Sequence, residues 1–349
     1  MMLAAQQVLC PRVSVALCTF NGESFLQTQL DSILAQTVLP GEIVIGDDGS
    51  SDGTQAILCG FQQRALALSV SVRIRRHPRN VGYVRNFAET LADCRAEIVL
   101  LSDQDDRWHP DRVARTLQRF DVQPSLLLLH SDACLINAHG VSLGMRLSQA
   151  LVMHSVEIHC IHEGRALDVL LMRNTVTGAT CAIRRSLLEM ALPIGSGWIH
   201  DEWLAMVAAV FGQMDMLEDP TIDYRQHGRN QIGARRASLL QRMRRLELFN
   251  PQQWKYKRLR LQALLALLER GGRSIAPDQY PGHAALLWRM WYGRMAMYRY
   301  REVGWDWFGH DLPRLLVRSL SVWLRAEGRV RCLCAAWAGA WAGWRSAIN

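Results

Sequence analysis

Hydrophobic positions in the first hundred residues alternate between strand-like and helix-like spacing. Continuous apolar runs predict buried strands over Arg12–Thr19, Glu42–Gly46, 70–75 and 97–101. Apolar residues at three- and four-residue steps predict helices between them, over 23–35, 54–63 and 84–93. Strands that alternate with helices are typical of a parallel sheet with right-handed crossover connections. We therefore expect an α/β fold here.

Three of the predicted strands end in polar clusters. Thr19–Gly22 follows the first strand, Asp47–Gly53 the second and Ser102–Asp106 the fourth. Ligands of open α/β sheets bind beyond the carboxyl ends of the strands. We therefore expect these three loops to meet at one edge of the sheet and to form one site.

The pattern is mixed from residue 126 to about residue 233. We expect a helix over 109–120, just before this part. Within it we expect strands at Leu126–His130, 175–183 and Thr221–His227, and a helix at Trp203–Phe211. Helical spacing then dominates, over 235–248, 252–270 and 283–301. We place a domain boundary near Gly233, between a first domain of residues 1–233 and a helical C-terminal region of residues 234–349.

Charge supports this boundary. The 349-residue chain has a net charge of +8, but residues 233–349 alone carry +14 and nine of the twelve tryptophans. Arginines interleaved with tryptophans suit an anionic membrane surface. The alternative is that these helices pack on the first domain, with tryptophans buried and arginines solvated. Nucleic acid is not an expected partner, because no recognised nucleic-acid-binding motif accompanies the charge.

The composition also bears on location. No run of about 18 apolar residues predicts a transmembrane helix, and the first residues lack the pattern of a signal peptide. The nine cysteines include no C-x-x-C pair. We therefore expect a cytoplasmic protein with reduced thiols, with peripheral contact at the inner face of the cell membrane if the basic region binds lipid.

The acidic loop after the fourth strand is a candidate cation site. Asp103, Asp105 and Asp106 place three mutually repelling carboxylates within four residues. Carboxylate oxygens and substrate phosphates suit hard cations such as Mg²⁺ or Mn²⁺. The alternative, a solvated turn or a helix cap, is less favoured beside two other polar loops. Glycine-rich phosphate loops are absent from the sequence, which disfavours dinucleotide dehydrogenases and P-loop NTPases.

Two further polar groups lie later in the chain. Asp201 and Glu202 stand where a glycine-containing loop gives way to a helix, where a carboxylate is also favoured by the helix dipole alone. His227 ends a predicted strand; imidazole is a good ligand for Mn²⁺-like ions, but an isolated histidine is more often structural. An acidic turn such as Asp47–Gly53 can likewise serve the chain turn alone or also offer a carboxylate to a nucleobase.

Taken together, these segments resemble family 2 glycosyltransferases with a GT-A fold, and more narrowly their rhamnosyltransferase-like bacterial branch. The resemblance covers about residues 12–233. It is carried by VSVALCTFNG (13–22), DSILAQT (31–37), EIVIGDDGSSDGT (42–54), NVGYVRNF (80–87), SDQDDRW (102–108), TGATCAI (177–183), HDEW (200–203) and YRQHGRNQIG (224–233). It implies a GT-A fold, a Rossmann-like and mostly parallel sheet, followed here by a C-terminal helical extension.

The resemblance also implies residue roles. Phe20 would pack on the nucleobase and Asp48 would accept its imide proton, while Asp103 would bind the ribose. Asp105 would bind the metal that bridges the diphosphate, with His227 as a further ligand. Asp201 would be the general base, with Glu202 as the alternative. The remaining residues expected to bind the nucleotide sugar are Thr19, Asn21, Glu23 and Arg85.

The implied reaction is an inverting, metal-dependent transfer of a sugar from a nucleotide-diphosphate donor to a hydroxyl. The branch suggests L-rhamnose from dTDP-rhamnose, with UDP- and GDP-sugars as alternatives, and a growing, lipid-linked cell-surface polysaccharide as acceptor. A non-catalytic membrane- or polyanion-binding protein on a degenerate transferase scaffold is a competing hypothesis. A sugar nucleotidyltransferase is disfavoured because it needs a glycine-rich, basic N-terminal loop.

Overall fold

The computed structural model describes residues 7–227, 259–260, 262–264 and 266–267. Within 7–227 its strands are β1 Val8–Thr19, β2 Val38–Asp47, β3 Ser71–Arg76, β4 Ile98–Ser102, β5 Arg107–Trp108, β6 Leu126–Asn137, β7 Ser142–Arg146, β8 Ala182–Arg184 and β9 Gln213–Gln226. The α-helices are α1 Leu26–Leu34, α2 Thr54–Ala67, α3 Tyr83–Asp93, α4 Arg112–Val122, α5 Leu147–Ala150, α6 Ser155–His162, α7 Ala166–Met172, α8 Ser186–Ala191 and α9 His200–Phe211. A short 3₁₀ turn spans Gly178–Thr180.

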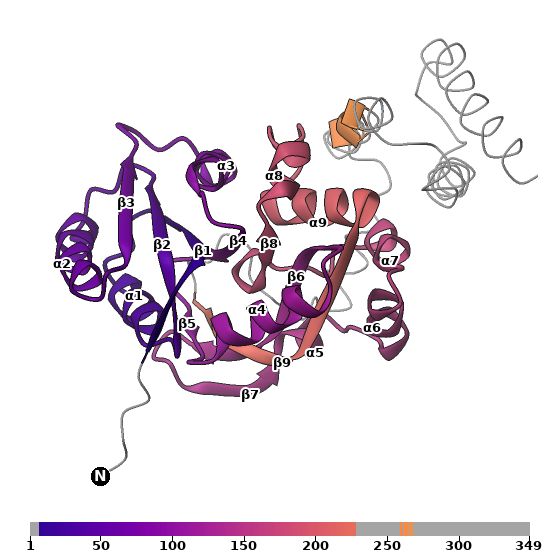
Figure 1. Cartoon of the computed structure of the whole chain (residues 1–349), viewed down its shortest axis with the longest axis horizontal. Helices are drawn as coiled ribbons and strands as arrows, with labels where there is room; N and C mark the ends of the chain where they lie inside the picture. Colours follow the sequence, from indigo (N-terminus) through magenta and orange to yellow (C-terminus); the bar gives the residue numbers. More distant parts are fainter. Residues whose placement is uncertain (1–6, 228–258, 261, 265, 268–349) are drawn as a thin grey trace, which may run out of the picture. The chain divides into compact units, whose positions relative to one another are not determined.

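One nine-stranded sheet joins all of these strands (Figure 1). Its order is β3-β2-β1-β4-β8-β6-β9-β5, and β7 pairs with β6. The first four strands are parallel, as the sequence predicts. The second half is mixed, because β8 runs antiparallel to both β4 and β6 while β6 and β9 are parallel. The fold is therefore an α/β fold.

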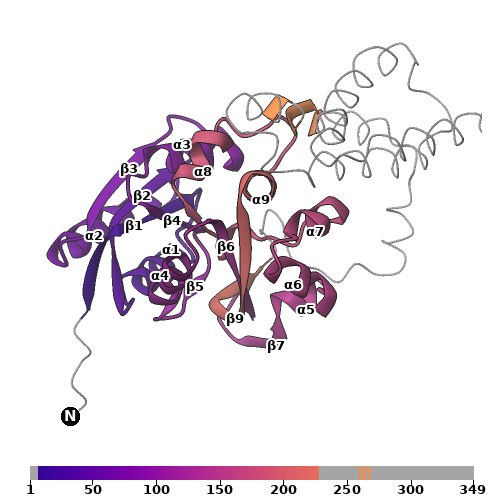
Figure 2. The ribbon, with the colours of Figure 1, turned by 45° about the vertical axis from the view of Figure 1, so that its right-hand side comes forward.

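Burial explains why the strands form where the sequence predicts them. The inward positions of β1 and β2, Val13, Val15, Leu17, Ile43 and Ile45, are fully buried. All four apolar residues of β4 are fully buried as well, as expected of a central strand covered on both faces. α3 packs on β1 and β2, and α9 packs on β6 and β9. Both views show α3 and α8 close to β4 and β8, the middle strands of the sheet (Figures 1 and 2).

The strand predicted over 175–183 is wrong in its first part. Residues Gly178–Thr180 form the 3₁₀ turn, and only Ala182–Arg184 pair in the sheet. The turn meets its own hydrogen-bonding needs, because Thr180 N donates to Thr177 O at 3.0 Å and Gly178 N donates to the Asp201 carboxylate at 2.8 Å. The β-branched threonines therefore serve a turn that positions a neighbouring carboxylate.

Several predictions fall at or beyond the limits of the described residues. A helix is predicted over 252–270. The described residues of this stretch are helical, namely 259–260, 262–264 and 266–267. Three predictions lie outside the described residues: the helices over 235–248 and 283–301, and the boundary near 233. Apart from the helical residues just named, the same is true of the C-terminal region. Among the described residues, no helix is long and apolar enough to cross a membrane.

Candidate active site

The polar loops after β1, β2 and β4 meet, as predicted. Thr19 Oγ1 donates to Gln104 Oε1 at 2.6 Å, and the Phe20 backbone N–H donates to the same oxygen at 2.8 Å. The Asn21 backbone N–H donates to Ser50 Oγ at 2.9 Å. Because β1 lies between β2 and β4 in parallel register, their carboxyl ends bring these loops to one edge of the sheet.

In the turn after β1, the backbone passes close to neighbouring side chains. Asn21 adopts a left-handed conformation with φ of 49°, which asparagine tolerates better than most residues. A Cβ on the next residue, Gly22, would lie 2.6 Å from Gln104 Oε1 and from Thr19 Oγ1, so any other residue would displace this hydrogen-bonded pair. Glu23 accepts a hydrogen bond from Gly53 N–H at 3.1 Å. The turn leaves the Phe20 side chain 40% exposed.

Asp48 is buried at the end of β2, in contact with the start of α3. Its two carboxylate oxygens accept hydrogen bonds from Val81 N at 2.6 Å and from Gly82 N at 3.0 Å. The neighbouring Asp47 is fully buried and accepts hydrogen bonds from Ser50 in the same loop and from Gln55 of α2. Asp47 therefore fixes the loop, while Asp48 lies at its boundary with α3.

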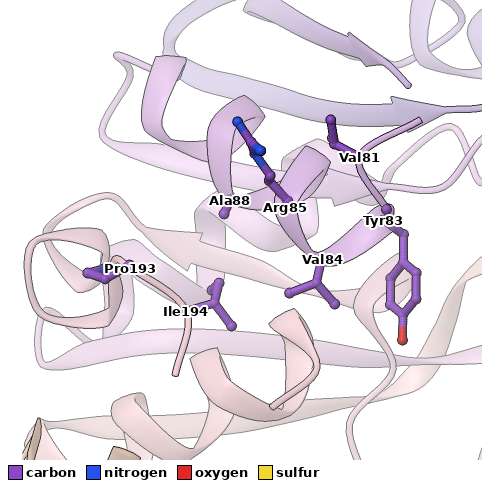
Figure 3. A pocket seen from close by; sticks show the side chains of 8 residues that line it. Val81, Tyr83, Val84, Arg85, Ala88, Pro193 and Ile194 are labelled. Carbon is purple, nitrogen blue, oxygen red and sulfur yellow. The ribbon is translucent and has the colours of Figure 1, made fainter. Parts of the chain in front are cut away.

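A pocket of about 370 Å³ opens beside the same end of α3 (Figure 3). Its lining is mostly apolar and comes from two segments, 81–88 and the loop after α8 at Pro193 and Ile194. Arg85, predicted to bind the nucleotide sugar, lines this pocket and donates from Nε to Glu89 at 2.7 Å. Tyr83, also in the lining, lies edge-on to the His200 ring, with centroids 6.1 Å apart.

The acidic loop after β4 concentrates negative charge. Burial is the main cause that raises the pKa of Asp103 to about 7, and the charges of Asp105 and Asp201 raise it further. Asp106 is 1% exposed, and burial raises its pKa as well. Its Oδ1 accepts a hydrogen bond from Arg225 N at 2.9 Å, whereas its Oδ2 is buried and has no hydrogen-bond partner among the residues that the structure describes. The carboxylates of this loop would therefore be stabilised by further positive charge or by further hydrogen-bond donors.

Asp105 and His227 are in direct contact. His227 Nε2 lies 2.6 Å from Asp105 Oδ2, and the two side chains are only 11% and 13% exposed respectively. The His227 ring also stacks on Phe25, with centroids 4.9 Å apart. Arg225 joins the same group, because its Nε donates to Asp105 O at 2.7 Å. The end of β9 is therefore fastened to the acidic loop, 122 residues away in sequence.

Asp201 lies in the first turn of α9, close enough to the acidic loop for its charge to raise the pKa of Asp103. Its Oδ2 accepts from Gly178 N at 2.8 Å and its Oδ1 from Glu202 N at 2.8 Å, so its carboxylate is held in one orientation. Glu202 is engaged elsewhere, in an ion pair with Arg260 at 2.7 Å. His200 is buried and stacks on Phe87 with centroids 4.0 Å apart; burial lowers the pKa of its imidazole.

Arg112 is a site residue that the sequence analysis missed. It is 1% exposed at the start of α4, and it donates to Leu101 O at 3.2 Å and to Cys181 O at 3.4 Å. Its guanidinium lies 4.0 Å from the centre of the Trp108 ring. Burial lowers its pKa to about 9, and its charge lowers the pKa of Asp103 and Asp106. Nothing in the sequence separates this arginine from the 37 others.

The donor set suits a hard divalent cation. Asp103 and Asp105 share the loop after β4 and Asp201 belongs to α9, and the charges of Asp105 and Asp201 raise the pKa of Asp103. Carboxylate oxygens with one imidazole are ligands that Mn²⁺ and Mg²⁺ accept. The residues present therefore fit the cation that the sequence predicts.

A known protein family and several curated proteins resemble part of this chain. The model of the family described as "Glycosyl transferase family 2" matches residues 14–189. An uncharacterized glycosyltransferase of Nostoc sp. is 25% identical over 233 residues, which cover 63% of this chain and 66% of the relative. An uncharacterized protein of Mycobacterium tuberculosis is 26% identical over 219 residues, which cover 62% and 59%. The matched segment thus spans less than two thirds of the length of these curated relatives.

A solved structure gives the corresponding likeness in three dimensions. The structure of TarS from S. aureus in complex with UDP-GlcNAc superimposes with a TM-score of 0.50. The match covers 63% of this chain and 60% of that chain, at 18% sequence identity. At that identity the likeness concerns the fold.

Proposed function

The chain belongs to the family 2 glycosyltransferases, and from this premise we propose that it is an inverting, divalent-cation-dependent transferase that uses a nucleotide-diphosphate sugar. Its fold is the GT-A fold that the sequence predicts. One observation carries the proposal. Carboxylates from two separate segments, Asp103 and Asp105 of the loop after β4 and Asp201 of α9, act on one another electrostatically, and His227 is in contact with Asp105.

The nucleotide would lie against the loops after β1 and β2. The exposed ring of Phe20 offers a stacking surface for the base, next to the Thr19–Gln104 contact. Asp48 keeps lone pairs free beyond its two backbone contacts, so it can accept the imide proton of a base. Asp103 would bind the ribose, and Asn21 and Glu23 would hold the turn in shape.

Asp105 and His227 would hold the cation, which when bound supplies positive charge to the departing diphosphate. Arg112 lies beneath the acidic loop and limits the repulsion among its carboxylates. Arg225 and Phe25 keep His227 against Asp105. These residues keep the site assembled before the donor arrives.

Asp201 would act as the general base. The acceptor hydroxyl loses its proton to Asp201, its oxygen bonds to the anomeric carbon, and the bond from that carbon to the diphosphate breaks with inversion. The backbone N–H groups of Gly178 and Glu202 orient this carboxylate. Glu202 is the weaker candidate, because Arg260 neutralises it.

The acceptor would approach along the pocket beside α3. Tyr83 joins this pocket to His200, the neighbour of Asp201, and the rest of its lining is mostly apolar. An acceptor with an apolar part, such as a lipid-linked glycan, suits this lining. We infer peripheral contact with the inner membrane from the basic C-terminal region, which lies outside the described residues.

The donor is tested by measuring nucleoside diphosphate release from a panel of sugar nucleotides with Mn²⁺, with Mg²⁺ and with EDTA. The panel contains dTDP-rhamnose, our first choice, together with GDP-sugars and UDP-GlcNAc, the ligand of the S. aureus structure. We expect one donor to be consumed, and EDTA to stop the reaction. Undiminished turnover in EDTA would contradict the cation role, and no turnover of any donor, with or without cell membranes as acceptor, would contradict the transferase proposal.

A further inference from the structure

A second group of metal-ligating side chains lies across β5, β6 and β9. His109 follows β5, Cys134 belongs to β6 and Asp223 belongs to β9. One ligand atom from each lies within 4.8 Å of the others, and His109 Nε2 is 2.9 Å from Asp223 Oδ1. None of the three has a role in the transfer reaction proposed above.

We propose that His109, Cys134 and Asp223 form a second cation site, which takes Zn²⁺ or a similar transition-metal ion. Imidazole nitrogen, thiolate sulfur and carboxylate oxygen together are the usual donors of zinc in proteins. Mg²⁺ and Mn²⁺ prefer oxygen ligands, so the thiol separates this site chemically from the oxygen-rich catalytic one. Three protein ligands leave a fourth position for water.

The spacing of the three ligand atoms is near what zinc requires. Ligand bonds of about 2.0–2.3 Å in a tetrahedron place ligand atoms roughly 3.3–3.7 Å apart. The 2.9 Å separation of His109 and Asp223 needs to open by a few tenths of an ångström, and the longest separation of 4.8 Å or less needs to close by about 1 Å at most. Side-chain rotation alone covers such changes.

The backbone holds the ligands in place. Cys134 and Asp223 are directly opposite each other in the β6–β9 pairing, and Arg107 pairs with Asp223 on the other side. His109 N donates to Thr221 O at 2.9 Å, which continues the β5–β9 ladder. Cys134 and Asp223 are therefore anchored on adjacent strands, and His109 is held directly after β5 by its backbone hydrogen bond to β9.

Arg107 limits how Asp223 can bind the ion. Its Nε and one terminal nitrogen contact Asp223 Oδ2 at 2.7 and 2.5 Å, so that oxygen is taken. Oδ1 faces His109 and is the oxygen left for the ion. Burial raises the pKa of the Cys134 thiol, so binding of the ion would release a proton from it.

Such an ion would act on the catalytic site through the strands. β5 begins directly after the acidic loop, and β9 ends one residue before His227. An ion bonded to His109, Cys134 and Asp223 would tie together β5, β6 and β9, and Asp105 and His227 lie just outside β5 and β9 in the chain. Its expected effect is stabilisation, without a direct part in the transfer reaction.

The test is a Co²⁺ titration of the full chain, with Co²⁺ as the spectroscopic substitute for Zn²⁺. We expect a thiolate-to-cobalt charge-transfer band, which Zn²⁺ abolishes by displacement. Cys134→Ser should remove the band and His109→Ala should weaken Co²⁺ binding at least tenfold, whereas Cys59→Ser, at an exposed cysteine of α2, should leave the band unchanged.

Two further measurements separate this proposal from the transferase proposal. Asp105→Asn should keep the band, because it alters only the catalytic site, and unchanged circular dichroism of Cys134→Ser would show that this variant still folds. A band that persists in Cys134→Ser, or no band in the folded wild-type chain, would overturn the second site. Neither result depends on whether a sugar donor is turned over.

Discussion

At the scale of single residues, the site combines carboxylates that are held in one orientation with an aromatic residue that is exposed. Asp48, Asp105 and Asp201 each have a partner that sets their orientation. Phe20, by contrast, is 40% exposed as a residue. This difference separates the residues that shape the site from the one that is free to meet a base.

Replacing Phe20 therefore tests where the nucleotide lies. We expect Phe20→Ala to weaken binding of the donor's nucleoside diphosphate by about 1–2 kcal/mol, roughly tenfold in Kd, because a stacking surface is lost. Phe20→Tyr should bind like the wild type, since its ring is kept. Calorimetric titration measures both, and equal affinity in all three proteins would place the base elsewhere.

His130 gives a prediction for stability against pH. It is buried on β6, and burial lowers the pKa of its imidazole to about 4, from 6.5 in the unfolded chain. Between pH 6.5 and 4 the His130 imidazole is protonated in the unfolded chain but neutral in the folded one. The free energy of unfolding therefore falls as the pH falls through this range. The loss attributable to His130 is on the order of 3 kcal/mol.

Urea unfolding at several pH values measures this loss. The His130→Gln variant has no imidazole to protonate, so its stability should fall less than that of the wild type between pH 6.5 and 4. Stability curves that run parallel over this range would show that His130 is not the group responsible. Above pH 7 the difference between the two proteins should be constant.

At the scale of elements, one buried cation supports the acidic loop. Arg112, at the start of α4, is expected to stabilise both the loop and the middle of the sheet, where β4 and β8 pair, through its carbonyl contacts. Arg112→Leu should lower the free energy of unfolding by about 3 kcal/mol, because it leaves buried carboxyls without their cation. Chemical denaturation measures this change.

Arg115→Leu is the matched control on the same helix. Arg115 is partly exposed, and its ion pairs with Asp111 and Asp219 are long, at 3.9 and 3.5 Å. Such pairs contribute less than about 1 kcal/mol. Equal losses in the two variants would mean that burial of the Arg112 charge has no special importance.

The elements also show where sequence patterns succeed. The strands predicted at Glu42–Gly46 and 97–101 formed because continuous apolar runs of that length are buried on both faces. The strand predicted over 175–183 failed in its first part because β-branched residues there serve a turn whose backbone bonds to Asp201. The short helices α5, α6 and α7 were not predicted, since four to eight residues carry too little periodicity.

The site was predictable only where neighbouring residues form a motif. The polar loops at Thr19, Asp48 and Asp103 follow strands and could be placed by the rule for parallel sheets. The roles of Asp105 and His227 as cation ligands came from resemblance to a family and stay a prediction, while the structure places the two side chains in contact. The long-range groups, Arg112 under the loop and Cys134 beside Asp223, left no signal, because their partners lie far away in sequence.

At the scale of the whole molecule, the chain joins a weakly acidic first part to a strongly basic remainder. Residues 233–349 carry a charge of +14, and we expect the full chain to sediment with anionic vesicles but not with neutral ones. Binding should weaken as salt is raised, because the attraction is screened. Equal sedimentation with both kinds of vesicle, or with neither, would favour the alternative in which these residues pack on the first domain.

The central claim is that Asp201 takes the acceptor proton in a site whose cation and nucleotide are held by other residues. The most direct measurement compares nucleoside diphosphate release and nucleoside diphosphate affinity for the wild type, Asp201→Asn and Glu202→Gln, using the donor identified from the panel. We predict that Asp201→Asn loses about 10²–10⁴-fold in turnover at unchanged affinity, while Glu202→Gln stays within tenfold of the wild type. Turnover by Asp201→Asn close to that of the wild type would contradict the account.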